Sequence, residues 1–293
     1  MPLFLFIILS LNSMVFPSPA VDGVKIVTRQ VTGGFTDLRT EYLTPDRMRN
    51  EWQTRAGEWS GPPMASIVQR GQHDHVYVMD LQAHEYVTYE TDSLAGPVRS
   101  QSKPVANSGG TLQILTNSVD TGERKKFFGR IARHIITRER RIPSPGACSL
   151  GSESQTDGWY LDASSVPEWS QPKSGYGVVI ASVVAAEPAT NCQDKMDKID
   201  VHHTGVDLGF PVKVTTTVQS QVPGRNGKLR MLASTWHSEI LELNQGPLDP
   251  ALFQVPANFR QVASLKSWIP ALPPSQELTG WEWLKAKLQE FFK

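Results

Sequence analysis

Short runs of β-forming residues recur about every ten residues with turn residues between them, and this spacing limits the fold more than any other feature. In the N-terminal third we predict strands over residues 24–31, 38–43, 46–53, 65–70, 75–81 and 85–91. Strands at such intervals are typical of antiparallel sheets and barrels. The sequence therefore predicts a mainly β protein.

The clearest predicted hairpin joins residues 38–43 to residues 46–53 through Thr44-Pro45-Asp46, because Pro and Asp favour a tight turn. In its second arm, polar and apolar residues alternate with charged ones. Period two would place the charged set, Arg47, Arg49 and Glu51, on the face opposite Met48, Asn50 and Trp52.

Further strands are predicted over residues 111–118, 123–128, 200–203, 206–221 and 228–243, with a turn at Asp120-Thr121-Gly122. Residues 94–110 and 142–156 are predicted loops, and Asp157-Gly158 a turn. The apolar segment 176–186 fits a buried strand or a core helix equally well. In residues 248–253 we expect a helical turn with Asp249 as its cap and Pro250 at its first position.

Residues 127–141 fit two patterns. Phe127, Ile131 and Ile135 recur every four residues, as in an amphipathic helix. We favour a strand, because β-branched residues are frequent and no helix cap is evident. Residues 124–141 contain eight basic residues and one acidic residue. They indicate either a patch for anionic lipid or phosphate, or a solvated outer strand face.

Composition excludes several classes of protein. The 29 basic residues balance 29 acidic ones, which argues against a nucleic-acid binder with a broadly basic surface. Two cysteines cannot form a four-cysteine zinc site or a disulfide-dense scaffold. A hydrophobic content of 39% is ordinary for a folded globular protein.

Residues 1–20 are predicted to be a signal peptide. They carry no charged side chain, and residues 3–11 form an apolar run that is too short to span a bilayer. Ser18 and Ala20 suit a cleavage site, although the usual basic start is missing. A retained anchor and a buried strand are the alternatives. Export would place the protein in the periplasm or cell envelope.

Export also changes how Cys148 and Cys192 are interpreted. In an oxidising compartment two cysteines are most simply a disulfide. Closing a loop of this length would stabilise the fold by about 3–4 kcal/mol. A nucleophilic cysteine is the alternative.

The chain ends in a predicted Pro-rich linker, residues 266–278, and an amphipathic helix, residues 279–293. Trp283 falls on the charged side of this helix, which suits contact with a membrane surface or a partner. Packing of the helix on the domain is the alternative. The predicted contact residues are Trp281, Trp283, Leu284, Leu288, Phe291 and Phe292.

Catalytic and metal motifs are scarce. His73 and His75 would lie on one face of a strand and could form half of a metal site, completed by His202 or His203. No zinc-protease, nucleophile-elbow or phosphate-loop motif occurs in the sequence. We therefore predict no catalytic residue, no metal and no cofactor, and keep a metal-dependent hydrolase as the least favoured alternative.

Several segments together resemble the outer-membrane lipoprotein carrier and lipoprotein-sorting superfamily of bacterial envelope proteins. The likeness covers about residues 22–262 and rests on residues 41–51, 76–81, 85–89, Gly205, 209–212 and 248–259. It implies an unclosed, strongly curved antiparallel β half-barrel over residues 21–265, with a few covering helices and an apolar cavity. The linker, the terminal helix and the cysteine-bearing insertion depart from the carrier pattern.

The resemblance implies a non-enzymatic protein that holds a lipid or lipoprotein acyl chain. Together with the amphipathic terminal helix and the balanced charge, it leads us to expect contact with a membrane through that helix and no nucleic-acid partner. An envelope structural or interaction protein with a filled core is the alternative. The residues expected to line the cavity are Tyr42, Met48, Trp52, Val76 and Val78.

Overall fold

A computed structural model describes residues 20–57, 59–69, 75–90, 107–167, 195–223 and 229–265. Most of the predicted signal peptide, His73, Cys192, the Pro-rich linker and the terminal helix lie outside the described residues.

The described chain is mainly β-strand, at 74% of its residues, which confirms the predicted class. Its fourteen strands are β1 (Val21–Thr32), β2 (Phe35–Leu43), β3 (Arg47–Ala56), β4 (Trp59–Ser60), β5 (Met64–Gln69), β6 (His75–Asp80), β7 (Glu85–Glu90), β8 (Asn107–Phe127), β9 (Arg130–Pro143), β10 (Ser152–Leu161), β11 (Lys195–Gly205), β12 (Phe210–Pro223), β13 (Leu229–Leu248) and β14 (Arg260–Gln261).

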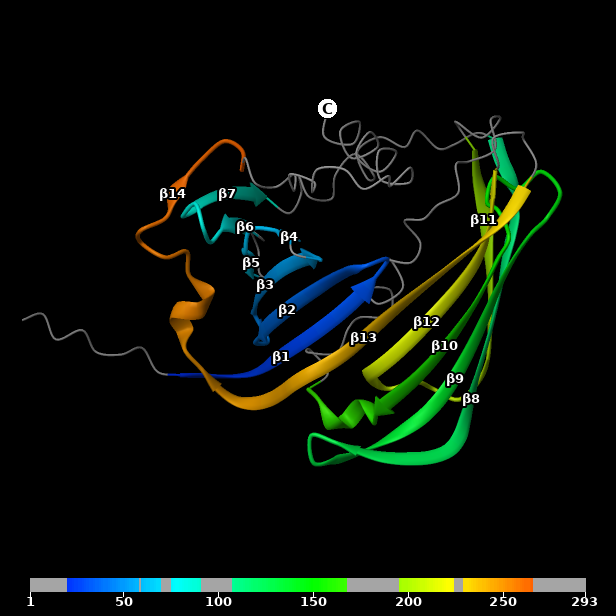
Figure 1. The fold of residues 1–293 in the computed structure, drawn as a ribbon, viewed down its shortest axis with the longest axis horizontal. Helices are drawn as coiled ribbons and strands as arrows, with labels where there is room; N and C mark the ends of the chain where they lie inside the picture. Colours follow the sequence, from blue (N-terminus) through cyan, green and yellow to red (C-terminus); the bar gives the residue numbers. More distant parts are fainter. Residues whose placement is uncertain are drawn as a thin grey trace, which may run out of the picture.

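All the strands belong to one sheet in the order β11-β8-β9-β10-β12-β13-β1-β2-β3-β5-β6-β7-β14, with β4 paired to β3 (Figure 1). The pairs are antiparallel except at the two ends, where β11 runs parallel to β8 and β14 parallel to β7. In the part of the chain that the structure describes, β11 and β14 do not pair with each other, so the sheet is unclosed.

The expected covering helices are not supported. Among the described residues the only helical elements are two short 3-10 turns, η1 (Ala163–Ser165) and η3 (Pro250–Phe253). The helical turn predicted after Asp249 is confirmed, because the Asp249 carboxylate accepts a hydrogen bond from the Ala251 amide at 2.9 Å. Irregular chain after η3, rather than a helix, packs on the sheet.

A core formed by strands from the middle of the sheet order shows that the sheet curls. Its buried residues come from strands as far apart as β2 and β9, which have four strands between them in the sheet order. Such side chains meet only if the sheet wraps around them. We call this cluster the lower core; it comprises Val24, Ile26, Leu43, Ala132, Leu161, Val166, Phe210, Val212, Ile240 and Leu243.

Strands β2, β3, β5, β6 and β7 form a first arm that is packed on both faces. On one face, Met64, Val76, Val78 and Val87 pack with Leu265. The other face carries a second cluster that includes Val255 and Phe259 from the chain after η3; its fully buried members are Ala65, Ile67 and Met79.

Strands β8 to β12 form a second arm, in which β8, β10 and β11 are longer than predicted, whereas β12 begins at Phe210 and not at residue 206. The predicted turn at residues 120–122 is wrong, because β8 continues through it with a bulge between Asp120 and Arg124 against β9. The strand favoured for residues 127–141 is confirmed by β9.

Strand β10 also corrects the predicted loop and turn before residue 159. It begins at Ser152, inside the predicted loop, and runs straight through the predicted turn at Asp157-Gly158. Glycine stands at position 158 because a Cβ there would lie 2.6 Å from the Tyr160 ring, and not because the chain turns.

Candidate functional site

The structure places the predicted cavity residues on two different faces of the first arm. Met48, Trp52, Val76 and Val78 share one face, as the registers of β3, β5 and β6 show. Tyr42 lies on the opposite face, beside Lys25 and Arg49. Its neighbour on β2, Leu43, is the residue that pairs with Met48, and successive residues of a strand point to opposite faces.

The face that carries Met48 and Trp52 is packed by the chain itself. Val76 and Val78 are buried, and Leu265 and Val262 pack against the same cluster as Trp52. Met48 packs against the lower core. In the described residues, this part of the sheet is therefore core, and the lining of a ligand cavity by these residues stays a prediction.

The second arm presents a different kind of surface. Four hydroxyl side chains, Ser118, Thr137, Thr156 and Thr216, lie in one row across β8, β9, β10 and β12. Two hydrogen bonds join them in pairs, Ser118 to Thr137 at 3.0 Å and Thr156 to Thr216 at 2.8 Å. We call the face of the second arm that carries this row the inner face.

The inner face is less exposed than the opposite, outer face. Along β10, residues 152, 154 and 156 are half-buried, whereas residues 153, 155 and 157 are exposed. This alternation is expected when one face of a curled sheet is concave. The residue types alternate as well, with Ser and Thr on the inner face and Glu, Gln and Asp on the outer face.

Apolar side chains flank the hydroxyl groups of the inner face. Ile199 and Val201 on β11 are 53% and 62% exposed, and Leu232 on β13 is 43% exposed. Through the registers, Val201 continues a row that passes Ile114, Arg141, Ser152 and Ser220 and ends at Leu232. The charge in this region is balanced by an ion pair between Arg141 and Glu139 at 2.8 Å.

A crossover segment, residues 206–209, closes the lower end of the inner face. Val206 and Leu208 pack there against Ile135, Tyr160 and Val214. Burial raises the pKa of Tyr160 to about 12. Gly205 permits the crossover because it has a φ of +95° and its Cα passes so close to the Ser118 carbonyl that a Cβ would collide with it.

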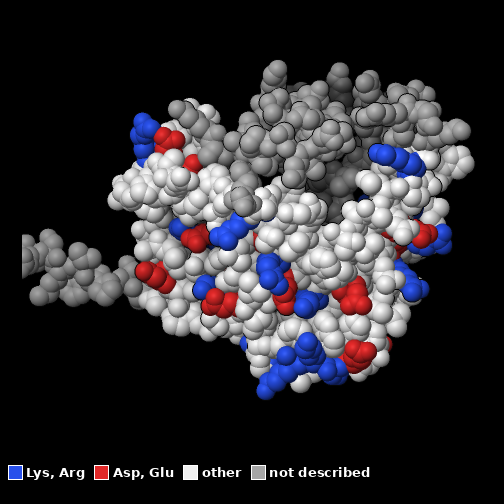
Figure 2. All heavy atoms as spheres, in the orientation of Figure 1, with Lys and Arg blue, Asp and Glu red and all other residues white. Residues whose placement is uncertain are grey.

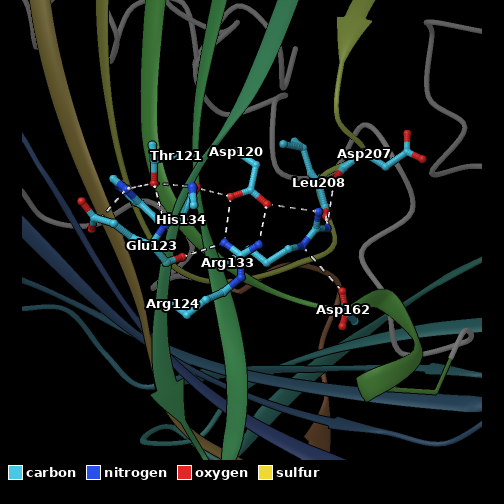
Figure 3. A network of polar contacts seen from close by, with 10 residues as sticks. Asp120, Thr121, Glu123, Arg124, Arg133, His134, Asp162, Asp207 and Leu208 are labelled. Carbon is cyan, nitrogen blue, oxygen red and sulfur yellow. Dashed lines mark hydrogen bonds and ion pairs between the residues drawn. The ribbon is translucent and has the colours of Figure 1, made fainter.

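A cluster of charged residues anchors this crossover (Figure 3). The Arg133 guanidinium donates hydrogen bonds to the carbonyl oxygens of Asp207 and Leu208 at 3.0 and 3.1 Å. Asp120 lies between two arginines, accepting two hydrogen bonds from Arg124 and lying 3.9 Å from Arg133. The hydrogen bonds from Arg124 and from the Gly122 amide hold the pKa of Asp120 below its usual range.

His134 makes a hydroxyl–imidazole–carboxylate chain on the outer face. Its Nδ1 lies 3.0 Å from the Thr121 hydroxyl and its Nε2 lies 2.9 Å from Asp157, while its ring stacks on Trp159. The geometry superficially resembles that of a nucleophile and its base. However, the Thr121 hydroxyl also bonds the His134 carbonyl and the Glu123 amide, so these contacts fix the bulge of β8.

The outer face is a lattice of paired charges. Glu239 accepts hydrogen bonds from Lys213 at 3.2 Å and from Arg29 at 2.7 Å. Burial raises the pKa of Glu239, but these hydrogen bonds outweigh it and hold the pKa below its usual range. A shallow depression of about 280 Å³ lies over these residues. Its charges satisfy one another, which favours a structural role.

The alternative metal site does not form in the described part of the chain. His75 lies on β6, whereas His202 and His203 lie on β11 at the far end of the sheet order. His202 lies 3.1 Å from Asp200, and no group of three potential ligands gathers among the residues that the structure describes.

Cys148 lies in a turn held by Asp197, whose carboxylate accepts hydrogen bonds from the amides of Cys148 and Ser149 at 2.8 and 2.7 Å. Burial raises the pKa of Asp197, but these bonds outweigh it and lower the pKa. The pairing of Cys148 with Cys192 stays a prediction, since Cys192 lies outside the described residues. The contact residues of the terminal helix lie outside them too.

Comparisons with protein-family models, with curated proteins and with solved structures found no match. The resemblance to lipoprotein carriers therefore stays a prediction. Within the described ranges, no helix combines the length and apolar character needed to cross a membrane.

Sequence reasoning missed the inner face because residues 152–156 were assigned to a loop. The period-two alternation of Ser152, Ser154 and Thr156 with Glu153 and Gln155 was the signal that could have found it.

Proposed function

We propose that this protein is a non-enzymatic exported envelope protein that binds the acyl chain of a lipid or lipoprotein on the inner face of the second arm. The observation that supports this most is the difference between the two faces of that arm. The outer face carries many paired charges, whereas the inner face carries, beside the Arg141–Glu139 ion pair, small hydroxyl groups between exposed Ile199, Val201 and Leu232.

An acyl chain suits such a surface because its binding needs little polar recognition. Each methylene removed from water contributes about 0.8 kcal/mol. The Trp236 side chain lies next to Thr216 across the β12–β13 pair, and its indole Nε1 is buried without a hydrogen-bond partner among the described residues. That N–H is a donor suited to a carboxyl or ester oxygen at the end of the ligand.

The membrane part of the proposal rests on the predicted terminal helix. Removing the chain from Thr279 onward, or combining Trp281→Ala with Phe291→Ala, is expected to weaken binding to liposomes. If the shortened chain binds liposomes as well as the full chain, this part of the proposal is wrong.

Native mass spectrometry of the protein purified from its own membrane fraction tests the ligand. We expect a bound species of lipid mass that is released on denaturation. Ser154→Trp, which fills the inner face, should reduce the bound fraction about tenfold, since a methylene chain and an indole cannot share that surface. Gln155→Trp, one residue along on the exposed outer face, is the matched control and should leave the bound fraction unchanged.

An envelope interaction protein with a filled core is the second candidate. It is favoured by the packing of Leu265 and Val262 over Val76 and Val78, where a cavity was predicted. Two results together would support this candidate and contradict the first. The protein would carry no lipid from any membrane fraction, and the Ser154→Trp variant would fold and keep its contacts with partners.

A further inference from the structure

The turn between β8 and β9 has an unusual residue at its apex. Phe127 pairs with Arg130 in the ladder, so Phe128 and Gly129 form a two-residue turn. Both have positive φ, 49° for Phe128 and 79° for Gly129. A turn with two positive φ angles belongs to the type that favours Asn-Gly, because bulky residues rarely adopt the left-handed conformation.

A second two-residue turn has glycine at both positions with positive φ, as is usual for this type of turn. Between β1 and β2, Gly33 and Gly34 adopt φ angles of 56° and 85° and meet no steric restriction. Phe128 accepts an unfavourable backbone conformation and yet remains 37% exposed. Because more than a third of this strained residue stays exposed, the aromatic ring at this apex points to contact with something outside the chain.

The residues around Phe128 combine exposed apolar and cationic groups. Ile131 is 59% exposed and stands opposite Lys126 in the β8–β9 ladder. Lys125 and Lys126 are exposed, and neither has an ion pair with a carboxylate among the described residues. By contrast, Arg124, one residue earlier, is bound by Asp120 at 2.8 Å.

The base of the turn is rigid. The Phe127 ring packs against Trp159 with 5.9 Å between ring centroids, and both residues pack on the lower core. The Lys125 ammonium lies 5.4 Å from the centre of the Phe127 ring. Figure 2 shows Lys and Arg side chains gathered at the lower end of the molecule, where Figure 1 places the β8–β9 turn.

We propose that this turn, comprising Lys125, Lys126, Phe128 and Ile131, is a contact site for an anionic lipid surface. Phe128 and Ile131 enter the headgroup region, and the two ammonium groups lie among the lipid phosphates. Apolar insertion combined with cations that no carboxylate neutralises is the combination that binds anionic bilayers. This site includes no residue of the hydroxyl row, of its apolar flanks or of the predicted terminal helix, so it does not depend on the proposed ligand.

The test measures binding of the full chain to vesicles of phosphatidylcholine and phosphatidylglycerol in equal amounts, and to vesicles of phosphatidylcholine alone. We expect binding to the mixed vesicles to be the stronger. Phe128→Asn should weaken it about tenfold, as expected for removing one inserted aromatic ring. Because asparagine suits the left-handed turn, this variant keeps its fold. Leu38→Thr, which removes an apolar side chain 44% exposed on β2, is the control and should have no effect.

The charge contribution is tested by the double variant Lys125→Gln/Lys126→Gln, expected to weaken binding to the mixed vesicles at least tenfold. Its control, Arg138→Gln/Arg140→Gln, removes the same charge from exposed positions further along β9 and should retain wild-type binding.

Three results would overturn the proposal. The first is equal binding of the wild-type protein to both kinds of vesicle, or to neither. The second is wild-type binding by Phe128→Asn when the lysine variant has lost it, which would show that the turn binds the vesicles through charge alone and that the ring does not insert. The third is an equal loss in the two charge variants, which would assign the effect to net charge.

Discussion

The two arms of the sheet are built from the same kind of strand but use their faces differently. In the first arm, strands β5, β6 and β7 have apolar residues covered on both faces, on one face by Leu265 and on the other by Val255 and Phe259. In the second arm the outer face carries exposed ion pairs, and the inner face carries hydroxyl groups flanked by exposed apolar residues. The difference is the reason why the first arm is assigned to stability and why ligand binding is proposed for the second arm.

The comparison also explains where the predicted cavity residues lie. The alternation of Met48, Asn50 and Trp52 identified one face of β3 correctly, but a face that is apolar in sequence is equally suited to core packing. Apolar side chains in the sequence therefore do not by themselves distinguish a binding face from a core face in this fold.

The largest effect that separates the arms is expected from Phe253→Ala in η3. Phe253 is completely buried, so its truncation leaves a cavity and should lower the free energy of unfolding by about 3–5 kcal/mol. Urea denaturation measures this. Tyr89→Ala on β7, where the ring is 36% exposed, is the control and should cost much less. Equal losses would show that η3 does not hold the first arm.

The two faces of the second arm are compared by Thr216→Val and Thr217→Val. Each threonine pairs with another across the sheet, Thr216 with Thr156 at 2.8 Å and Thr217 with Thr235 at 3.1 Å. Thr216→Val should lower the free energy of unfolding by about 1–2 kcal/mol, because the Thr156 hydroxyl loses its partner on the inner face. Thr217→Val should change it by no more than about 0.5 kcal/mol, since water replaces the lost hydrogen bond on the outer face. Equal costs in urea denaturation would contradict the asymmetry of the faces.

A smaller effect, of opposite sign, is expected at the turn of the second arm. Phe128→Asn should raise the free energy of unfolding by about 0.5 kcal/mol, because asparagine tolerates the φ of 49° better than phenylalanine. Gly129→Ala, at a φ of 79°, should lower it by about 1 kcal/mol. If Phe128→Asn destabilises the protein, the ring serves the fold and the argument for an external contact is weakened.

The smallest effect concerns acid stability at the crossover. The pKa of Asp120 is lowered from 3.8 in the folded protein, so its contribution is complete above the unfolded value and disappears as the pH falls through the folded value. Asp120→Asn should therefore reduce the loss of stability that the protein shows as the pH falls below the unfolded pKa of 3.8. Thermal unfolding over this range measures it. Asp207→Asn, whose carboxylate has no ion pair in the described part of the chain, should behave like the wild type.

The sequence was informative where one physical rule acted alone. The hairpin at Thr44-Pro45-Asp46 and the cap at Asp249 rest on local hydrogen bonds, and both were predicted correctly. The predicted turn at Asp120-Thr121-Gly122 is wrong. The residues before and after it pair with the same strand, β9, so the chain does not reverse there and these residues form a bulge.

Most of the candidate site depended on distant contacts that local patterns do not encode. Gly158 is predicted as a turn residue, but the structure requires glycine there because the Tyr160 ring leaves no room for a Cβ. The row from Ser118 to Thr216 joins four strands whose order in the sheet the sequence does not specify. The alternation in β10 was visible, but the Pro, Ser and Gly content of the residues before it masked the start of the strand.

The pairing of β1 with β13 has a consequence for how the protein folds. These strands are neighbours in the middle of the sheet, and the ion pair between Lys25 and Glu242 joins residues 217 positions apart in the chain. Ladders this remote in sequence carry a large loop-closure entropy and form slowly. A ribosome must therefore deliver nearly the whole chain before the two arms can be joined, and until then the nascent protein has an open sheet edge at β1.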